Sequence, residues 1–237
     1  KDYDLGALAG YEEYYYKRDT RNATKKGLID SSIHTPGSAT EMLSVGGGAF
    51  DRASRSFFGR INYAYKSRNL FEANLRHDGN ARYHSDYRWG TFPSFSAAWR
   101  ISEEDFMINT KNWLDNLKLR VSYGSVGNIP YSKYPQYGLY SVSSNYNGIP
   151  AILISQVGNK DLTWEQTYTA GVGIDANFFN NRLRFVFDYY NKYTSNILYQ
   201  VPVSGLTGIT SRWQNVGEMR NSGIEITIGG DIIRTKD

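Results

Sequence analysis

The feature that most constrains the fold of this chain is an alternation of apolar and polar residues with a period of two. In the clearest run, Phe71, Ala73 and Leu75 alternate with Glu72 and Asn74. Successive side chains of a β-strand point to opposite faces, so this alternation predicts half-buried strands. The same pattern recurs in other runs, at residues 57–66, 94–101, 117–123, 167–177, 183–190 and 224–228, and more weakly at 5–16.

Helical periodicity is nearly absent. Residues 103–114 could hold one short helix, with Ser102 as a possible N-cap. No run approaches the roughly 20 consecutive apolar residues that a membrane helix needs, and the mean hydropathy is −0.54. We therefore predict an all-β chain that does not cross a membrane by helices.

The connections between the predicted strands alternate in length. Short turns lie at residues 67–69 and 179–182, and the 103–116 connection falls on the same side. Long polar loops lie at 19–53, 78–91 and 127–161, with an intermediate loop at 204–212. If sequential strands pair, about eight antiparallel strands result, with all long loops at one end. This layout is typical of an up-and-down transmembrane β-barrel.

A soluble β-sandwich also alternates, but its strands usually span about five or six residues. The run at 164–178, followed by 182–203, is too long for that, and several strands reach the roughly 9–11 residues that cross a bilayer. Aromatic residues near strand ends also suit the interfacial girdles of a barrel. They are Phe92, Trp99, Phe178, Phe179, Tyr193 and Tyr199.

Composition excludes several classes of site. The chain has no cysteine, which excludes a disulfide scaffold, a thiolate zinc site and a cysteine nucleophile. The net charge is only +4 and the basic residues are scattered, so we expect no nucleic-acid partner. His34, His77 and His84 lie in or beside loops without metal-ligand spacing. We expect no catalytic residues, no metal and no cofactor.

The predicted long loops are rich in aromatic residues, which suit contact with a glycan, a peptide or a protein lid. The alternative is that these rings pack the loops onto each other, and the residue types alone favour that packing role. The candidates for ligand or lid contact are Tyr83, Tyr87, Trp89, Tyr131, Tyr134, Tyr137, Tyr140 and Tyr146.

Several blocks of sequence occur together in one order. They include GRINYAY at residues 59–65, LRHDGNARY at 75–83, GTFPSFSAAWRISEE at 90–104 and LDNLKLRVSYGSVGN at 114–128. Further blocks lie at 161–165, 178–183 and 215–225. In this order, over most of the chain, they resemble the SusC/RagA-type TonB-dependent outer-membrane transporters.

The resemblance implies a large barrel around an N-terminal plug. It implies import of bulky nutrients, often glycans or peptides, across the outer membrane of Bacteroidota-like bacteria. It also implies a SusD-like lipoprotein lid as partner, and energy delivered through the plug by TonB. Residues 1–237 contain no plug segment and do not end in a final barrel strand. We therefore expect a middle section of the barrel domain, in contact with outer-membrane lipid and with the remainder of its own barrel. A soluble β-rich carbohydrate-binding module is the alternative function.

Overall fold

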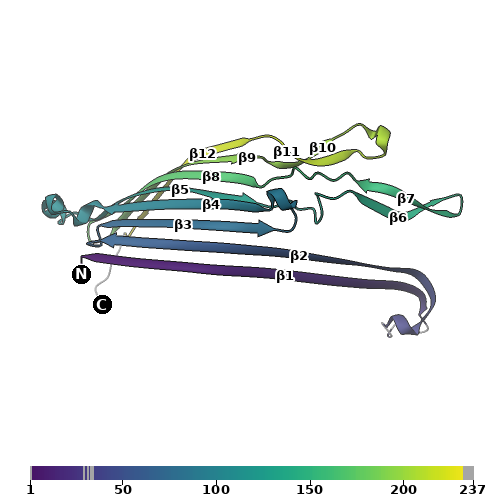
Figure 1. Cartoon of the computed structure of the whole chain (residues 1–237). Helices are drawn as coiled ribbons and strands as arrows, with labels where there is room; N and C mark the ends of the chain where they lie inside the picture. The colour runs from purple at the N-terminus through teal and green to yellow at the C-terminus, as the bar shows by residue number, and fades with distance from the viewer. Residues whose placement is uncertain (1, 29, 31, 33–34, 232–237) are drawn as a thin grey trace.

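The computed structural model describes residues 2–28, 30, 32 and 35–231. Its main element is one curved antiparallel sheet with the strand order β1-β2-β3-β4-β5-β8-β9-β12 (Figure 1). This sheet of eight strands confirms the predicted all-β architecture and its strand count. The strands are β1 (Tyr3–Leu28), β2 (Ala39–Tyr65), β3 (Asn69–Asn80), β4 (Trp89–Arg100), β5 (Leu114–Asn128), β8 (Glu165–Phe178), β9 (Leu183–Ser195) and β12 (Met219–Gly230).

Each strand pairs with the strand that precedes it in the sheet, so the connections fall alternately at the two ends. Residues 66–68 and 179–182 form tight turns at one end, where the non-glycine residues Lys66, Phe179 and Asn180 have positive φ. The connections β1–β2, β3–β4, β5–β8 and β9–β12 all lie at the other end. The predicted segregation of long loops to one side is therefore confirmed.

The predicted loop at 19–53 is wrong, because most of it is strand. β1 has 26 residues and β2 has 27, against 12 in β3. Their pairing continues through Tyr16↔Arg52 and Arg18↔Phe50 to Leu28↔Ala39. β3 pairs with β2 only from Ser54 onward, so the hairpin overhangs its neighbour by about 50 Å at about 3.3 Å per residue. Figure 1 shows β1 and β2 running well past β3.

Two smaller hairpins occupy other segments that the sequence predicts as loops. β6 (Leu139–Tyr146) pairs with β7 (Ile149–Gln156), within the predicted loop at 127–161. β10 (Leu198–Pro202) pairs with β11 (Ser211–Asn215), on either side of most of the predicted loop at 204–212. Each pair forms a separate sheet of two strands at the loop end.

The short helix expected at 103–114 is confirmed in part. Two short 3-10 helices stand there, η3 (Ile101–Glu103) and η4 (Asp105–Thr110). Glu104 separates them in an extended conformation, with φ −77° and ψ 149°, so no continuous helix forms. Ser102 lies inside η3 rather than at its N-cap. The other 3-10 helices are η1 (Pro36–Ser38), η2 (Ser85–Tyr87) and η5 (Gly205–Thr207). No helix among the described residues is both long and apolar enough to span a membrane.

The register sorts the side chains of the main sheet onto two faces, because residues paired across strands share a face. One row of the apolar face contains Leu5, Tyr63, Phe71, Ala97, Val121, Val172, Tyr189 and Ile224. One row of the polar face contains Arg60, Asn74, Ser94, Thr169, Lys192 and Asn221. Much of the apolar face is exposed: Leu5 is 68% accessible and Ile226 60%. A continuous exposed apolar face of this kind marks a surface that contacts a membrane or another protein rather than water.

Candidate functional site

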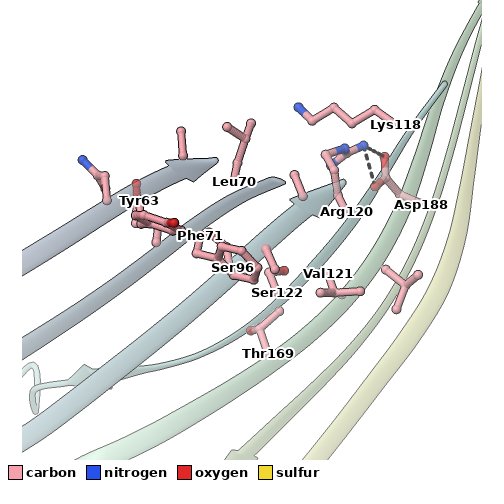
Figure 2. A pocket seen from close by; sticks show the side chains of 18 of the residues that line it. Tyr63, Leu70, Phe71, Ser96, Lys118, Arg120, Val121, Ser122, Thr169 and Asp188 are labelled. Atoms are coloured by element: carbon pink, nitrogen blue, oxygen red, sulfur yellow. Dashed lines mark hydrogen bonds and ion pairs between the residues drawn. The ribbon is translucent and has the colours of Figure 1, made fainter. Parts of the chain in front are cut away.

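The polar face holds a charge network in its middle. Arg120 on β5 donates to Asp175 on β8, with Nε 2.9 Å from Oδ2 and Nη2 2.8 Å from Oδ1. The same Nη2 lies 3.1 Å from Oδ1 of Asp188 on β9. Figure 2 shows the Arg120–Asp188 contact above the strands. Gly173 pairs with Arg120 across the sheet, and a Cβ there would collide with the Asp188 carboxylate. The missing side chain leaves room for the network.

A second network lies on the polar face closer to the loop end. Arg76 Nε lies 2.7 Å from Asp78 Oδ1, and its Nη2 lies 3.1 Å from Glu12 Oε2 and 2.9 Å from Ser56 Oγ. The Arg76 guanidinium also lies 5.6 Å from the Phe58 ring centroid. These two arginines of the polar face are therefore already paired with carboxylates, and their contacts join β5 to β8 and β9 and β3 to β1 and β2.

A small buried cluster closes the loop end of the sheet. It consists of Tyr83, Phe92, Leu162 and Trp164. The Tyr83 hydroxyl donates to the Asn128 carbonyl at 3.0 Å, and its ring lies 5.0 Å from Trp164. Burial raises the pKa of the Tyr83 hydroxyl well above its usual range. Tyr83 is 0% exposed, so this candidate packs the loops and presents no face to a ligand.

Five of the other predicted contact residues are exposed. Tyr131 is 94% accessible, and Tyr140 and Tyr146 on the β6–β7 hairpin are 69% and 80% accessible. Tyr87 and Tyr137 are also exposed. Within the described part of the chain, no ring-to-ring contact joins any of these five tyrosines. The structure places them on one end of the molecule without bringing them into a single cluster.

The two remaining candidates have protein partners. Trp89 stacks nearly parallel on His77, with ring centroids 4.9 Å apart and an interplanar angle of 3°. Trp89 pairs with Gly79 on the apolar face, so it stands at the loop-end rim of that face rather than among the loop tyrosines. Tyr134 is half-buried, and its hydroxyl accepts from the Asp51 backbone N–H at 3.4 Å.

The aromatic residues predicted to form interfacial girdles differ in their exposure and contacts, as two of them show. Trp99 is 39% exposed at the short-turn end, where its Nε1 donates to Glu104 at 2.9 Å. Phe92 instead lies in the buried cluster, with 6% accessibility. For metals, the described residues hold no group of three His, Cys, Asp or Glu side chains arranged to bind an ion. His34 lies outside the described residues.

The family model described as "TonB dependent receptor-like, beta-barrel" matches residues 2–234. The chain belongs to this family. It is 34% identical over 97% of its length to TonB-dependent receptor P39 of Formosa agariphila, and 36% identical over 99% to TonB-dependent receptor SusC of Bacteroides thetaiotaomicron. It covers 22% and 24% of those two proteins, so it spans about a quarter of the length of its curated relatives.

The structural comparison agrees with the family. The chain superposes on the RagAB peptide importer in its closed-closed state with a TM-score of 0.89 and 31% identity, covering 100% of this chain and 26% of the other. The ferric enterobactin receptor PfeA matches with a TM-score of 0.56 at 17% identity, covering 94% of this chain and 30% of the other, which shows the fold alone.

Membership of this family confirms the sequence resemblance and the outer-membrane location. The relatives are named as receptors and importers rather than enzymes, in agreement with the expectation of no enzymatic activity. The exposed apolar face is the lipid-facing surface, and the polar face with its arginine networks lines the barrel interior. The matches favour the barrel over a soluble carbohydrate-binding module.

One group of residues at the loop end escaped the sequence prediction. Tyr14, Tyr16, Phe50 and Arg52 fall on one face of the β1–β2 hairpin, in or beside the segment that the sequence predicts as a loop. The local sequence carries little alternation to signal a strand, since Tyr14, Tyr15 and Tyr16 are consecutive and are followed by the consecutive basic residues Lys17 and Arg18. Its polar and glycine-rich composition concealed the strand.

Proposed function

We propose that residues 1–237 form a section of the barrel wall of a TonB-dependent importer of bulky nutrients, either glycans or peptides. The importer acts with a SusD-like surface lipoprotein and takes its energy from TonB through a plug that lies elsewhere in a longer receptor. The sheet edges support the longer chain: within the part of the chain that the structure describes, β1 and β12 each have a neighbour on one side alone. Lipid does not tolerate such open edges, and further strands would close them.

The observation that carries this proposal is the superposition on RagAB, which is named a peptide importer, over the whole of this chain. A TM-score of 0.89 at 31% identity extends beyond the general barrel fold, since PfeA reaches 0.56. SusC, at 36% identity, supports the same type of transporter.

The exposed loop aromatics are the surface that we assign to ligand or lid. Tyrosine supplies a flat apolar ring and a hydroxyl, which suit both sugars and peptides. This assignment covers Tyr87, Tyr131, Tyr137, Tyr140 and Tyr146. Tyr83 is left out because it is buried, and Trp89 and Tyr134 are weaker candidates because each already contacts the protein.

The test uses the full-length receptor, tagged and purified from native outer membranes in mild detergent. We expect a surface lipoprotein to co-purify in a stoichiometric amount, and a receptor deletion to abolish growth on one class of glycan or peptide. Simultaneous Tyr131→Ala, Tyr140→Ala and Tyr146→Ala changes should weaken lipoprotein retention or uptake without lowering the amount of receptor. A receptor that purifies alone, with a deletion strain that grows normally on every glycan and peptide, would contradict the proposal.

A further inference from the structure

A continuous ladder of cations and aromatic rings lies at the base of the β1–β2 overhang. Lys133 Nζ stands 4.0 Å from the Phe50 ring centroid, and the Phe50 ring lies 5.6 Å from that of Tyr16. The Arg52 guanidinium lies 4.9 Å from the Tyr16 centroid and 5.3 Å from that of Tyr14. The Arg52 Nη2 also donates to the Tyr14 hydroxyl at 3.1 Å. These contacts hold the Arg52 side chain in one place before any ligand arrives.

The ladder continues the polar face of the barrel wall outward. The cross-strand pairs Tyr14↔Ser54, Tyr16↔Arg52 and Arg18↔Phe50 have the same parity as Glu12↔Ser56. Ser56 in turn pairs with Asp78 on that face. The ladder therefore stands at the loop-end mouth of the barrel, on the side that faces the interior.

A third cation, Arg82, adds to the positive charge. Burial, together with the nearby charge of Arg52, lowers the pKa of Arg82 below its usual range. Arg82 Nη1 donates to the Pro130 carbonyl at 2.6 Å, which fixes the guanidinium and leaves other donors of its five N–H groups available.

No acidic side chain in the described ranges forms an ion pair with these cations. Among the described residues, the ion pairs do not include Arg52, Arg82 or Lys133. Deeper on the same face, Arg76 and Arg120 are each paired with two carboxylates. Asp51, adjacent to Arg52, points to the opposite face, where it accepts from the Tyr15 hydroxyl at 3.3 Å. Like charges held together without a counterion indicate a site for an anion.

We propose that Arg52, Arg82 and Lys133 bind carboxylate groups of an oligomeric nutrient at the mouth of the barrel, while the rings of Tyr14 and Tyr16 bind its less polar parts. Guanidinium groups match carboxylates in a two-point geometry, and aromatic faces pack on sugar rings or peptide chains. The carboxylates are those of uronic acids in a glycan or of acidic residues in a peptide. This inference rests on the proposed import function and specifies the charge of its substrate.

The experiment measures binding by the full-length receptor in detergent, using isothermal titration calorimetry. The acidic probes are hexamers of galacturonic acid and of glutamate, and the uncharged probes are methyl-esterified hexagalacturonate and hexaglutamine. We expect one acidic probe to bind and its uncharged counterpart to bind at least tenfold more weakly. The acidic probe that binds identifies the source of the carboxylate. Binding should weaken as salt increases, because exposed charges are screened.

The variants are Arg52→Gln, Arg82→Gln and the double substitution. Each arginine should contribute about a tenfold change in Kd, which corresponds to about 1.4 kcal/mol. Lys17→Gln is the matched control, since Lys17 lies next to Tyr16 on the opposite face of β1 and should leave Kd unchanged. The yield of each variant in the outer membrane shows that it folds.

Several results would overturn this inference: failure of both acidic probes to bind, equal binding of charged and uncharged probes, or an unchanged Kd in the double variant. Loss of lipoprotein co-purification in the double variant, with probe binding intact, would identify the ladder as a lid contact and would also overturn it. Lipoprotein retention, and growth of the strain that carries the unsubstituted receptor, are measured separately. These two results can therefore support the importer function even if the proposal of an acidic substrate is contradicted.

Discussion

Arg120 on β5 and Asp175 on β8 form a two-point ion pair on the polar face, with Nε and Nη2 at 2.9 and 2.8 Å from the two carboxylate oxygens. The side chains retain 36% and 26% of their accessibility. Because Nη2 also reaches Asp188, one guanidinium holds together β5, β8 and β9. The pair is thus a link between strands rather than an isolated surface contact.

The first prediction removes that link. Arg120→Met leaves Asp175 and Asp188 without the guanidinium that joins them. We expect the free energy of unfolding of the full-length receptor to fall by about 1 kcal/mol, a value discounted for the partial exposure of the group. Urea titration in lipid vesicles measures it. The control is Arg100→Met, which breaks a pair with Glu103 three residues away in the short-turn region, joining no two strands of the sheet, and should change stability by less than half as much. Equal effects of the two substitutions would contradict a linking role for Arg120.

The second prediction concerns Gly127, near the end of β5. A Cβ at this position would collide with the Phe92 ring and approach Trp164 Cε3 to 2.8 Å. Both rings belong to the buried cluster, where added volume forces displacement, so Gly127→Ala should destabilise the loop end by about 1–3 kcal/mol. Hydrogen exchange of the amides at residues 129–164 measures the effect. Gly48→Ala is the control because nothing lies within 4 Å of its Cβ position; faster exchange in that variant would disprove the steric explanation.

The third prediction uses the buried hydroxyl of Tyr83. Burial raises its pKa in the folded state above the unfolded value of about 10. Above pH 10 the unfolded chain loses this proton while the folded chain keeps it. The stability contributed by neutral Tyr83 is therefore present below pH 10 and falls as the pH rises, by up to about 1.4 kcal/mol per pH unit.

Tyr83→Phe removes the titrating group together with the hydrogen bond to Asn128. We expect a loss of about 1 kcal/mol at neutral pH and a shallower decline of stability above pH 10 than in the unsubstituted receptor. Limited proteolysis of the loops between pH 8 and pH 11 compares the two proteins. Tyr131→Phe, at a side chain that is 94% exposed, should follow the unsubstituted curve. Parallel curves for Tyr83→Phe and the unsubstituted receptor would exclude the buried hydroxyl as the cause.

The barrel wall was predictable from sequence because each wall strand must present one face to lipid and one to the interior. That requirement produces the alternation of apolar and polar residues seen from Phe71 to Leu75. The overhang was not predictable in the same way. Past Ser54, toward its tip, the β1–β2 hairpin no longer pairs with β3, and polar residues occur on both of its faces, so the alternation weakens.

The candidate site was only partly predictable, because residue type alone does not show whether a loop residue is buried or exposed. A tyrosine in a loop satisfies packing and recognition equally well, and burial separates the two roles. Tyr83 is enclosed and Tyr131 is not, although both lie in aromatic, polar loop sequence. The cation ladder depends on a contact between Lys133 and Phe50, which are far apart in sequence, and no local pattern reports such a contact.

The last prediction tests which face of the sheet meets lipid. Phe187 pairs with Ile174 and Ile226 on the apolar face, and its neighbour Val186 pairs with Asp175 and Thr227 on the polar face. An arginine on the lipid face costs about 2–4 kcal/mol near the bilayer midplane, so Phe187→Arg should lower the free energy of unfolding in vesicles by that amount. Val186→Arg places the same charge one residue away and beside the Asp175 carboxylate, where the interior accommodates it. We expect the Val186 variant to lose less than 1 kcal/mol, measured by the same urea titration, since its charge remains in a polar, ion-paired environment. If the two costs were reversed, the faces assigned here to lipid and to the barrel interior would be exchanged.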